Sequence, residues 1–171
     1  MHRLRTLLRD LDERRRHRST ARAVQRVDPE PESWLDVGTG DARFPAAARR
    51  LFPYTSFDGL DPTPRVLPAW DAERIDEAYV GDLTDPHLTR VLAARYDVVS
   101  MRHSTDGLDA ALTLLRPGGH LLLETTAAAA DALRAELAAL HCAIVPTRRH
   151  PLLDRLSGTT RLVARRAPSP A

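Results

Sequence analysis

The sequence of 171 residues predicts an α/β fold, a mostly parallel sheet of seven strands with helices on both faces. Three observations carry this prediction. Short apolar segments alternate with helical segments from residue 33 onward, a pattern typical of parallel strands joined by crossover helices. A Gly-x-Gly turn, Gly38-Thr39-Gly40, follows the first apolar segment, where such sheets open a ligand site. The last two apolar segments have no convincing helix between them, so we expect an antiparallel final strand.

The chain begins with a basic arm, residues 1–30, which we expect to be helical over residues 3–26. Leucines recur there at helical spacing, and neither Pro nor Gly interrupts them. The apolar stripe thins over residues 14–18, which leaves open whether the arm is one helix or two. Asp28-Pro29-Glu30-Pro31 ends the helix. Residues 1–27 carry nine Arg against three acids, a net charge of +6, whereas residues 28–171 carry sixteen Arg against twenty acids, a net charge of −4.

One domain is expected over residues 31–166, followed by a disordered tail at 167–171 that contains two prolines. Apolar runs predict strands at 33–37, 56–60, 77–81, 96–101, 120–124, 142–147 and 159–165. The stretches between them predict helices at 42–52, 64–71, 85–95, 107–115 and 127–140. The second and third strands run into acidic residues, Asp61 and Asp82, and Pro117-Gly118-Gly119 predicts a turn into the fifth strand. The last helix is rich in Ala and Leu, with its charged residues facing outward.

The composition excludes several classes of protein. No apolar run is long enough to span a bilayer, and the N-terminus lacks an apolar signal core, so we expect a cytoplasmic protein without a membrane partner. A single cysteine, Cys142, excludes an internal disulfide framework. The histidines lack ligand spacing with one another and with Cys142, so no metal site is expected.

The glycine turn narrows the choice of ligand. Gly38 and Gly40 let the backbone approach a ligand closely, and the following helix presents free N–H groups. A dinucleotide fingerprint needs a very small residue three positions after Gly40. Arg43 stands at that position, which disfavours an NAD-linked dehydrogenase.

Four features in order resemble one family. They are Leu35-Asp36-Val37-Gly38-Thr39-Gly40, Asp61 at the end of the second strand, Gly81-Asp82 after the third, and residues 114–124 around the fifth. Together they resemble the class I S-adenosylmethionine (SAM) methyltransferases over about residues 33–166. Residues 57–61 and 96–103 look more narrowly like a bacterial subgroup that acts on small molecules. The resemblance implies a Rossmann-like domain, SAM as cofactor and S-adenosylhomocysteine (SAH) as product.

The resemblance also implies roles for particular residues. The cofactor-binding set would be Asp36, Gly38, Thr39, Gly40, Asp61, Pro62, Asp82, Leu83, Ser100 and Met101. Asp36 would face the methionine amino group, Asp61 the ribose hydroxyls and Asp82 the adenine amino group. Leu83 would pack on the adenine ring, and Ser100 and Met101 would lie under the sulfonium. Each acid has a structural alternative: Asp36 and Asp82 could cap the following helices, and Asp61 could form an Asx-turn.

His103 is the candidate catalytic base, because it follows the fourth strand beside the expected methyl group and imidazole titrates near neutral pH. A substrate or cofactor contact and a purely structural role remain open for it. His17 and His150 could reach the same place, but the sequence does not position them. Only residues 104–116 separate His103 from Pro117, a shorter segment than the related subgroup has, which leaves the N-terminal helix as the obvious cover.

These observations favour SAM-dependent methyl transfer to a small molecule, for example a secondary metabolite. One alternative is a SAM-binding protein that does not methylate, such as a cyclase or a regulatory subunit. A second is an RNA-associated methyltransferase that uses the arginine-rich arm. Nucleic acid is disfavoured because the rest of the chain lacks interleaved aromatic and basic residues. The leucine stripe of the arm (Leu4, Leu7, Leu8 and Leu11) makes a homodimer plausible.

Overall fold

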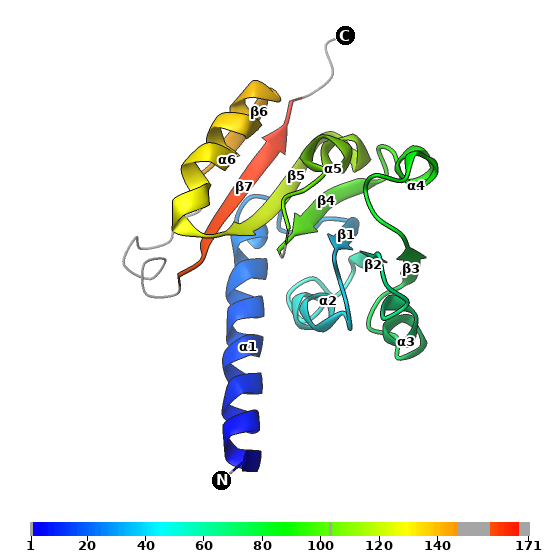
Figure 1. The fold of residues 1–171 in the computed structure, drawn as a ribbon, viewed down its shortest axis with the longest axis vertical. Helices are drawn as coiled ribbons and strands as arrows, with labels where there is room; N and C mark the ends of the chain where they lie inside the picture. Colours follow the sequence, from blue (N-terminus) through cyan, green and yellow to red (C-terminus); the bar gives the residue numbers. More distant parts are fainter. Residues whose placement is uncertain (1, 103, 147–157, 168–171) are drawn as a thin grey trace.

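The computed structural model describes residues 2–102, 104–146 and 158–167. Its strands form one sheet of seven, in the order β3-β2-β1-β4-β5-β7-β6 (Figure 1). They are β1 (Ser33–Val37), β2 (Ser56–Asp61), β3 (Glu77–Val80), β4 (Tyr96–Met101), β5 (Leu115–Thr125), β6 (Cys142–Val145) and β7 (Thr160–Arg166). Strands β1 to β5 are parallel, and β7 runs antiparallel to both β5 and β6. The predicted fold class is therefore confirmed.

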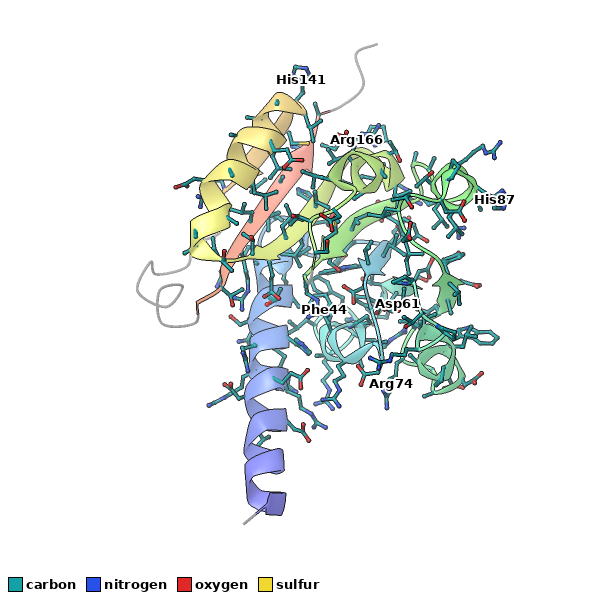
Figure 2. All side chains as sticks on the ribbon, in the orientation of Figure 1. Phe44, Asp61, Arg74, His87, His141 and Arg166 are labelled. Carbon is teal, nitrogen blue, oxygen red and sulfur yellow. The ribbon has the colours of Figure 1, made fainter. Side chains whose placement is uncertain are left out.

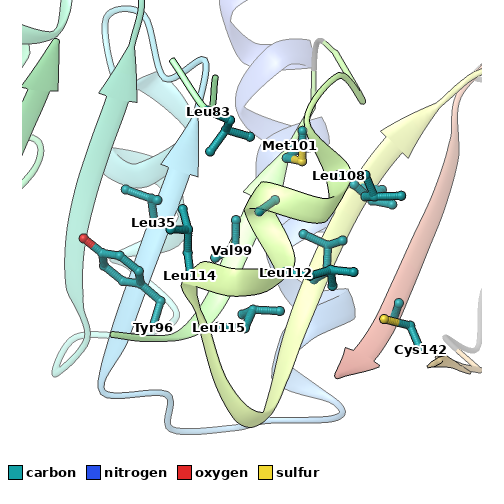
Figure 3. Close-up of a cluster of buried hydrophobic side chains, with 14 of the residues drawn as sticks. Leu35, Leu83, Tyr96, Val99, Met101, Leu108, Leu112, Leu114, Leu115 and Cys142 are labelled. Carbon is teal, nitrogen blue, oxygen red and sulfur yellow. The ribbon is translucent and has the colours of Figure 1, made fainter. Parts of the chain in front are cut away.

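The helices lie on both faces of this sheet. They are α1 (His2–Gln25), α2 (Arg43–Ala48), α3 (Val66–Asp71), α4 (Pro86–Val91), α5 (Leu108–Leu114) and α6 (Ala127–Ala139). Apolar side chains of α1, α2 and α3 pack with Trp34 and Phe57 on one face. Side chains of α5 and α6 pack with Val99 and Leu121 on the other, where Figure 3 shows part of the cluster. Both faces of the central parallel strands β1, β2 and β4 are largely buried, which explains their apolar runs.

The sequence left open whether the arm is one helix or two, and α1 runs unbroken through residues 14–18. Two of the expected helix ends were wrong. The helix expected at 85–95 ends at Val91, because the backbone N–H groups of Ala94 and Arg95 donate to carbonyls at the end of α5 instead of continuing the helix. The helix expected at 42–52 likewise ends at Ala48, and residues 49–52 follow as turns.

The turn expected at Pro117-Gly118-Gly119 is instead an irregular part of β5. The pairing of β4 with β5 shifts register between Tyr96 and Val98, opposite this segment. Gly118 has φ +82°, and a Cβ on Gly119 would lie 3.0 Å from two backbone carbonyl oxygens. The glycines are therefore required by a close approach of two strands inside the sheet.

The C-terminal part of α1 packs against the sheet and α2, whereas its first turns project away from them (Figure 1). Thr20, Ala21 and Val24 are fully buried, but Leu11 is 56% exposed. Thr20 and Ser19 also take part in hydrogen bonds with Glu124 of β5 and Arg161 of β7. The arm is thus anchored at one end, over the carboxyl end of β5.

Candidate functional site

The glycine turn lies at the carboxyl end of β1 with open space above it. Gly38 and Gly40 have φ +69° and +55°, and a Cβ built on either would meet nothing within 4 Å. The N–H groups of Gly38 and Thr39 donate to the carbonyl of Leu60, at 2.8 and 3.2 Å, which fixes the turn to β2. The turn therefore leaves room for a ligand beside its backbone.

Asp61, at the end of β2, holds the glycine turn and its own loop together (Figure 2). Its Oδ2 accepts from Gly40 N–H at 2.8 Å, and its Oδ1 accepts from the N–H and hydroxyl of Thr63, at 2.9 and 2.5 Å. Burial acts to raise the pKa of Asp61, but the bonds from Thr63 and Gly40 hold it below its usual value. Asp61 therefore does form an Asx-turn, the alternative raised by the sequence. With three hydrogen bonds accepted, about one of the four acceptor positions of the carboxylate stays open to a ligand. Pro62 beside it is exposed.

Asp82 repeats the arrangement of Asp61 on the next strand. Its Oδ1 accepts from the N–H and the hydroxyl of Thr84, which lowers the pKa of Asp82. It does not cap α4, since Asp85 accepts the N–H groups at that helix start. Asp82 is exposed and Leu83 beside it is 7% exposed, so a polar and an apolar group stand next to each other. The shared Asp-x-Thr spacing was a sequence signal for both turns that we did not use.

Asp36 lies buried at the end of a chain of hydrogen bonds. The indole of Trp34 donates to the Ser100 hydroxyl at 2.9 Å, and that hydroxyl donates to Asp36 Oδ1 at 2.6 Å. Asp36 Oδ2 is buried without a hydrogen-bond partner. It does not cap α2, which begins after Ala42 without a side-chain cap. The side chains of Ser100 and Met101 face the interior, so only their backbone could contact a ligand.

Two further residues lie near Asp36: Arg102, to which the sequence assigned no role, and His17, which the sequence did not position. Arg102 is 5% exposed, with its Nε 3.6 Å from Asp36 Oδ1 and its guanidinium 4.1 Å from the centre of the Phe44 ring. His17 of α1 packs edge-on against Phe44, and burial, aided by Arg102, lowers its pKa. His103 and His150 lie outside the described residues. No local pattern marks Arg102, because its burial depends on packing between α1, α2 and β4.

A cavity of about 340 Å³ lies between α1 and α2, beside the glycine turn. Its wall includes His17 and the following charged residues: Asp10, Glu13, Arg14, Arg18, Asp41, Arg43, Arg50 and Arg74. Arg43 binds Asp41 at 2.7 Å and Glu13 at 2.9 Å, which ties α2 to α1. Arg43 therefore braces the wall of this cavity. Arg74 donates to the Asp41 carbonyl at 2.9 Å.

The residues expected to bind a cofactor thus gather at one edge of the sheet. Asp36, Asp61 and Asp82 lie at or just after the carboxyl ends of the neighbouring strands β1, β2 and β3, where open α/β sheets bind ligands. Within the described residues, no group of His, Cys, Asp and Glu could hold a metal ion. In the same part of the chain, no helix is long and apolar enough to cross a bilayer.

A family model described as a methyltransferase domain matches residues 11–159. The chain belongs to this family. Its fold is that of the class I SAM-dependent methyltransferases, so SAM is the cofactor and SAH the product. The match begins within α1, so the anchored half of the arm is part of the family domain. No curated protein matches the sequence.

Solved methyltransferases share the fold at low sequence identity. One is 1,6-didemethyltoxoflavin-N1-methyltransferase from Burkholderia thailandensis, with a TM-score of 0.65 and 18% identity over 88% of this chain and 78% of that one. Another is the N-methyltransferase NodS from Bradyrhizobium japonicum with SAH, with a TM-score of 0.65 and 16% identity over 92% and 88%. The antibiotic-resistance methyltransferase Kmr has a TM-score of 0.58 and 21% identity over 79% and 87%. These likenesses establish the fold and leave the acceptor open.

The residues present fit such a cofactor. The glycine turn has space for it, and Asp36 Oδ2 is a buried acceptor without a donor. Asp61 and Asp82 offer further acceptors along the same edge.

Proposed function

We propose that this protein transfers a methyl group from SAM to a small-molecule acceptor. One observation carries the proposal: an open glycine turn, a buried carboxylate oxygen without a donor and two further aspartates lie along one edge of the sheet. Asp36 would accept from the methionine ammonium, Asp61 from the ribose and Asp82 from the adenine amino group. Pro62, Thr39 and Leu83 would complete the walls around these groups.

The chemistry asks little of the protein beyond alignment. SAM supplies a methyl carbon already activated by positive sulfur, and displacement at that carbon is in line. The protein has to hold the acceptor opposite the sulfur and exclude water. If the acceptor must lose a proton, His103 stays the predicted base. His17 is a second imidazole with a lowered pKa, so at neutral pH it can accept a proton.

The cavity between α1 and α2 supports a small acceptor. Its volume falls within the range of small-molecule sites, and its wall includes Asp41, which directly follows the glycine turn. Arg14, Arg18 and Arg50 on its wall have no acidic partner among the described residues. These arginines favour an acceptor that carries a phosphate or a carboxylate. Two of the similar structures are named as N-methyltransferases, one of them with a bound small-molecule ligand, 1,6-didemethyltoxoflavin.

Calorimetry with SAH and a methyl-transfer assay test the proposal together. We expect wild-type protein to bind SAH, and Asp61→Asn to bind it roughly 10- to 100-fold more weakly, because a charge-assisted hydrogen bond is lost. Asp71→Asn, an exposed acid at the end of α3, is the matched control and should bind normally. Transfer from labelled SAM to members of an acceptor panel would support an enzyme. Binding without transfer to any acceptor would favour a SAM-binding protein that does not methylate.

The RNA-associated alternative makes a different prediction. Arginines of α1 that neutralise RNA phosphates would give binding that weakens steeply as salt rises. Weak or salt-independent RNA binding would count against it. A homodimer through the exposed face of α1 and a cytoplasmic location remain predictions, for light scattering and cell fractionation to check.

A further inference from the structure

Three buried polar atoms at the carboxyl edge lack hydrogen-bond partners among the described residues: Thr39 Oγ1 in the glycine turn and, on charged side chains, Asp36 Oδ2 and Arg102 Nε. The two charged side chains are 0% and 5% exposed. The two residues approach each other at 3.6 Å, between Arg102 Nε and Asp36 Oδ1, which is too long for a good hydrogen bond. Native proteins leave few buried polar atoms unpaired, so such an atom indicates a missing partner, for example a bound ligand.

The neighbouring groups do not supply the missing partners. Glu124, a partly buried acid at the end of β5, already accepts hydrogen bonds from Thr20 and from Arg161, the latter at 2.9 Å. His17 is kept neutral by burial, which lowers its pKa. Phe44 supports the guanidinium of Arg102 from one side at 4.1 Å and offers no acceptor. The site therefore holds one fixed negative and one fixed positive group, each with an unsatisfied atom.

A ligand that satisfies both atoms needs a cation and an anion a few ångströms apart. The ammonium and carboxylate of an amino acid have this arrangement. Asp36 lies within β1 next to its last residue, and Arg102 directly follows the paired strand β4, in which Ser100 aligns with Asp36. They therefore lie beside the glycine turn, where the methionine part of SAM is expected.

Resting on the proposed function, we infer that Arg102 binds the carboxylate of the methionine part of SAM, while Asp36 Oδ2 binds its ammonium. A guanidinium can hold a carboxylate through two parallel N–H bonds, so the pair recognises charge and orientation together. Arg102 would thus make the site select SAM and SAH over analogues that lack the carboxylate. The competing explanation is that Arg102 only balances the charge of Asp36.

Calorimetry with two probes separates these explanations without using activity. The probes are SAH and decarboxylated SAH, which keeps the adenosine, the sulfur and the ammonium but lacks the carboxylate. We expect wild-type protein to prefer SAH by roughly 10- to 100-fold, the contribution of a charged hydrogen-bonded pair. Arg102→Gln should bind both probes with nearly equal affinity. Arg134→Gln, an exposed arginine on α6, is the control and should keep the wild-type preference.

Arg102→Lys provides a second test if the Gln variant does not fold. It keeps the positive charge beside Asp36 but cannot form the two parallel N–H bonds of a guanidinium, so the preference for SAH should shrink without vanishing. An unchanged preference in either variant would refute the role of Arg102, and so would wild-type protein that binds both probes equally. In both cases SAH binding, and with it the proposed function, would stand. Failure of wild-type protein to bind either probe would overturn both proposals.

Discussion

Glu124 fastens α1 to the sheet, and its removal should loosen the cover of the site. Its Oε1 accepts from the Thr20 hydroxyl at 2.5 Å and from Arg161 Nε at 2.9 Å, and the Arg161 side chain is 5% exposed. Glu124→Gln keeps the shape but leaves the buried Arg161 cation without its partner, which costs about 3–5 kcal/mol. In a domain of this size each kcal/mol lowers Tm by about 2–4 °C, so we expect a fall of about 6–20 °C.

Thermal unfolding measures this loss, and trypsin reports where it occurs. Residues 1–27 contain nine arginines, so an undocked α1 should be cut faster than the rest of the domain. Glu136→Gln on the exposed side of α6 is the matched control and should leave both measurements unchanged. A Glu124→Gln protein with wild-type Tm and wild-type cleavage of α1 would refute the argument.

Three further predictions concern the same framework. Burial acts to raise the pKa of Glu124, but its hydrogen bonds lower it below 4.5, so its stabilisation is complete above about pH 4.5 and is lost as pH falls through the lowered pKa. Urea titrations should show this acid loss in wild type and not in Glu124→Gln. Tyr96→Phe removes the 2.7 Å bond to buried Asp58 and should cost about 1.5–3 kcal/mol at pH 7. Burial raises the pKa of Asp58, so the cost should shrink as pH falls through that raised pKa and the carboxyl becomes neutral; a cost that does not change with pH would contradict this. Gly59→Ala would place a Cβ 2.7 Å from Thr39 Cγ2, costing about 1–3 kcal/mol and weakening SAH binding through the glycine turn; normal stability and affinity would disprove the close approach.

Features that depend only on residues close together in the sequence were predicted well. The apolar runs located every strand to within one or two residues of its observed start, apart from β5, because a buried parallel strand needs such a run whatever surrounds it. The antiparallel β7 followed from the missing helix before it. Helix ends were predicted less well, since α4 stops where its chain finds acceptors on α5, far away in sequence. The glycines of β5 were mistaken for a turn for a similar reason, because the strand that crowds them is remote in sequence.

The sequence by itself determined the fold class, the family resemblance and the acids of the cofactor edge. Glycine spacing and carboxylates at strand ends are short sequence motifs, so they can be recognised without knowledge of the tertiary structure. Only the tertiary structure decided how the acids are used. It tied Asp61 to Gly40, left Asp36 Oδ2 without a partner and brought Arg102 beside it. These contacts join segments that are distant along the chain. Whether a buried charge is paired or left open to a ligand depends on the groups that packing places around it.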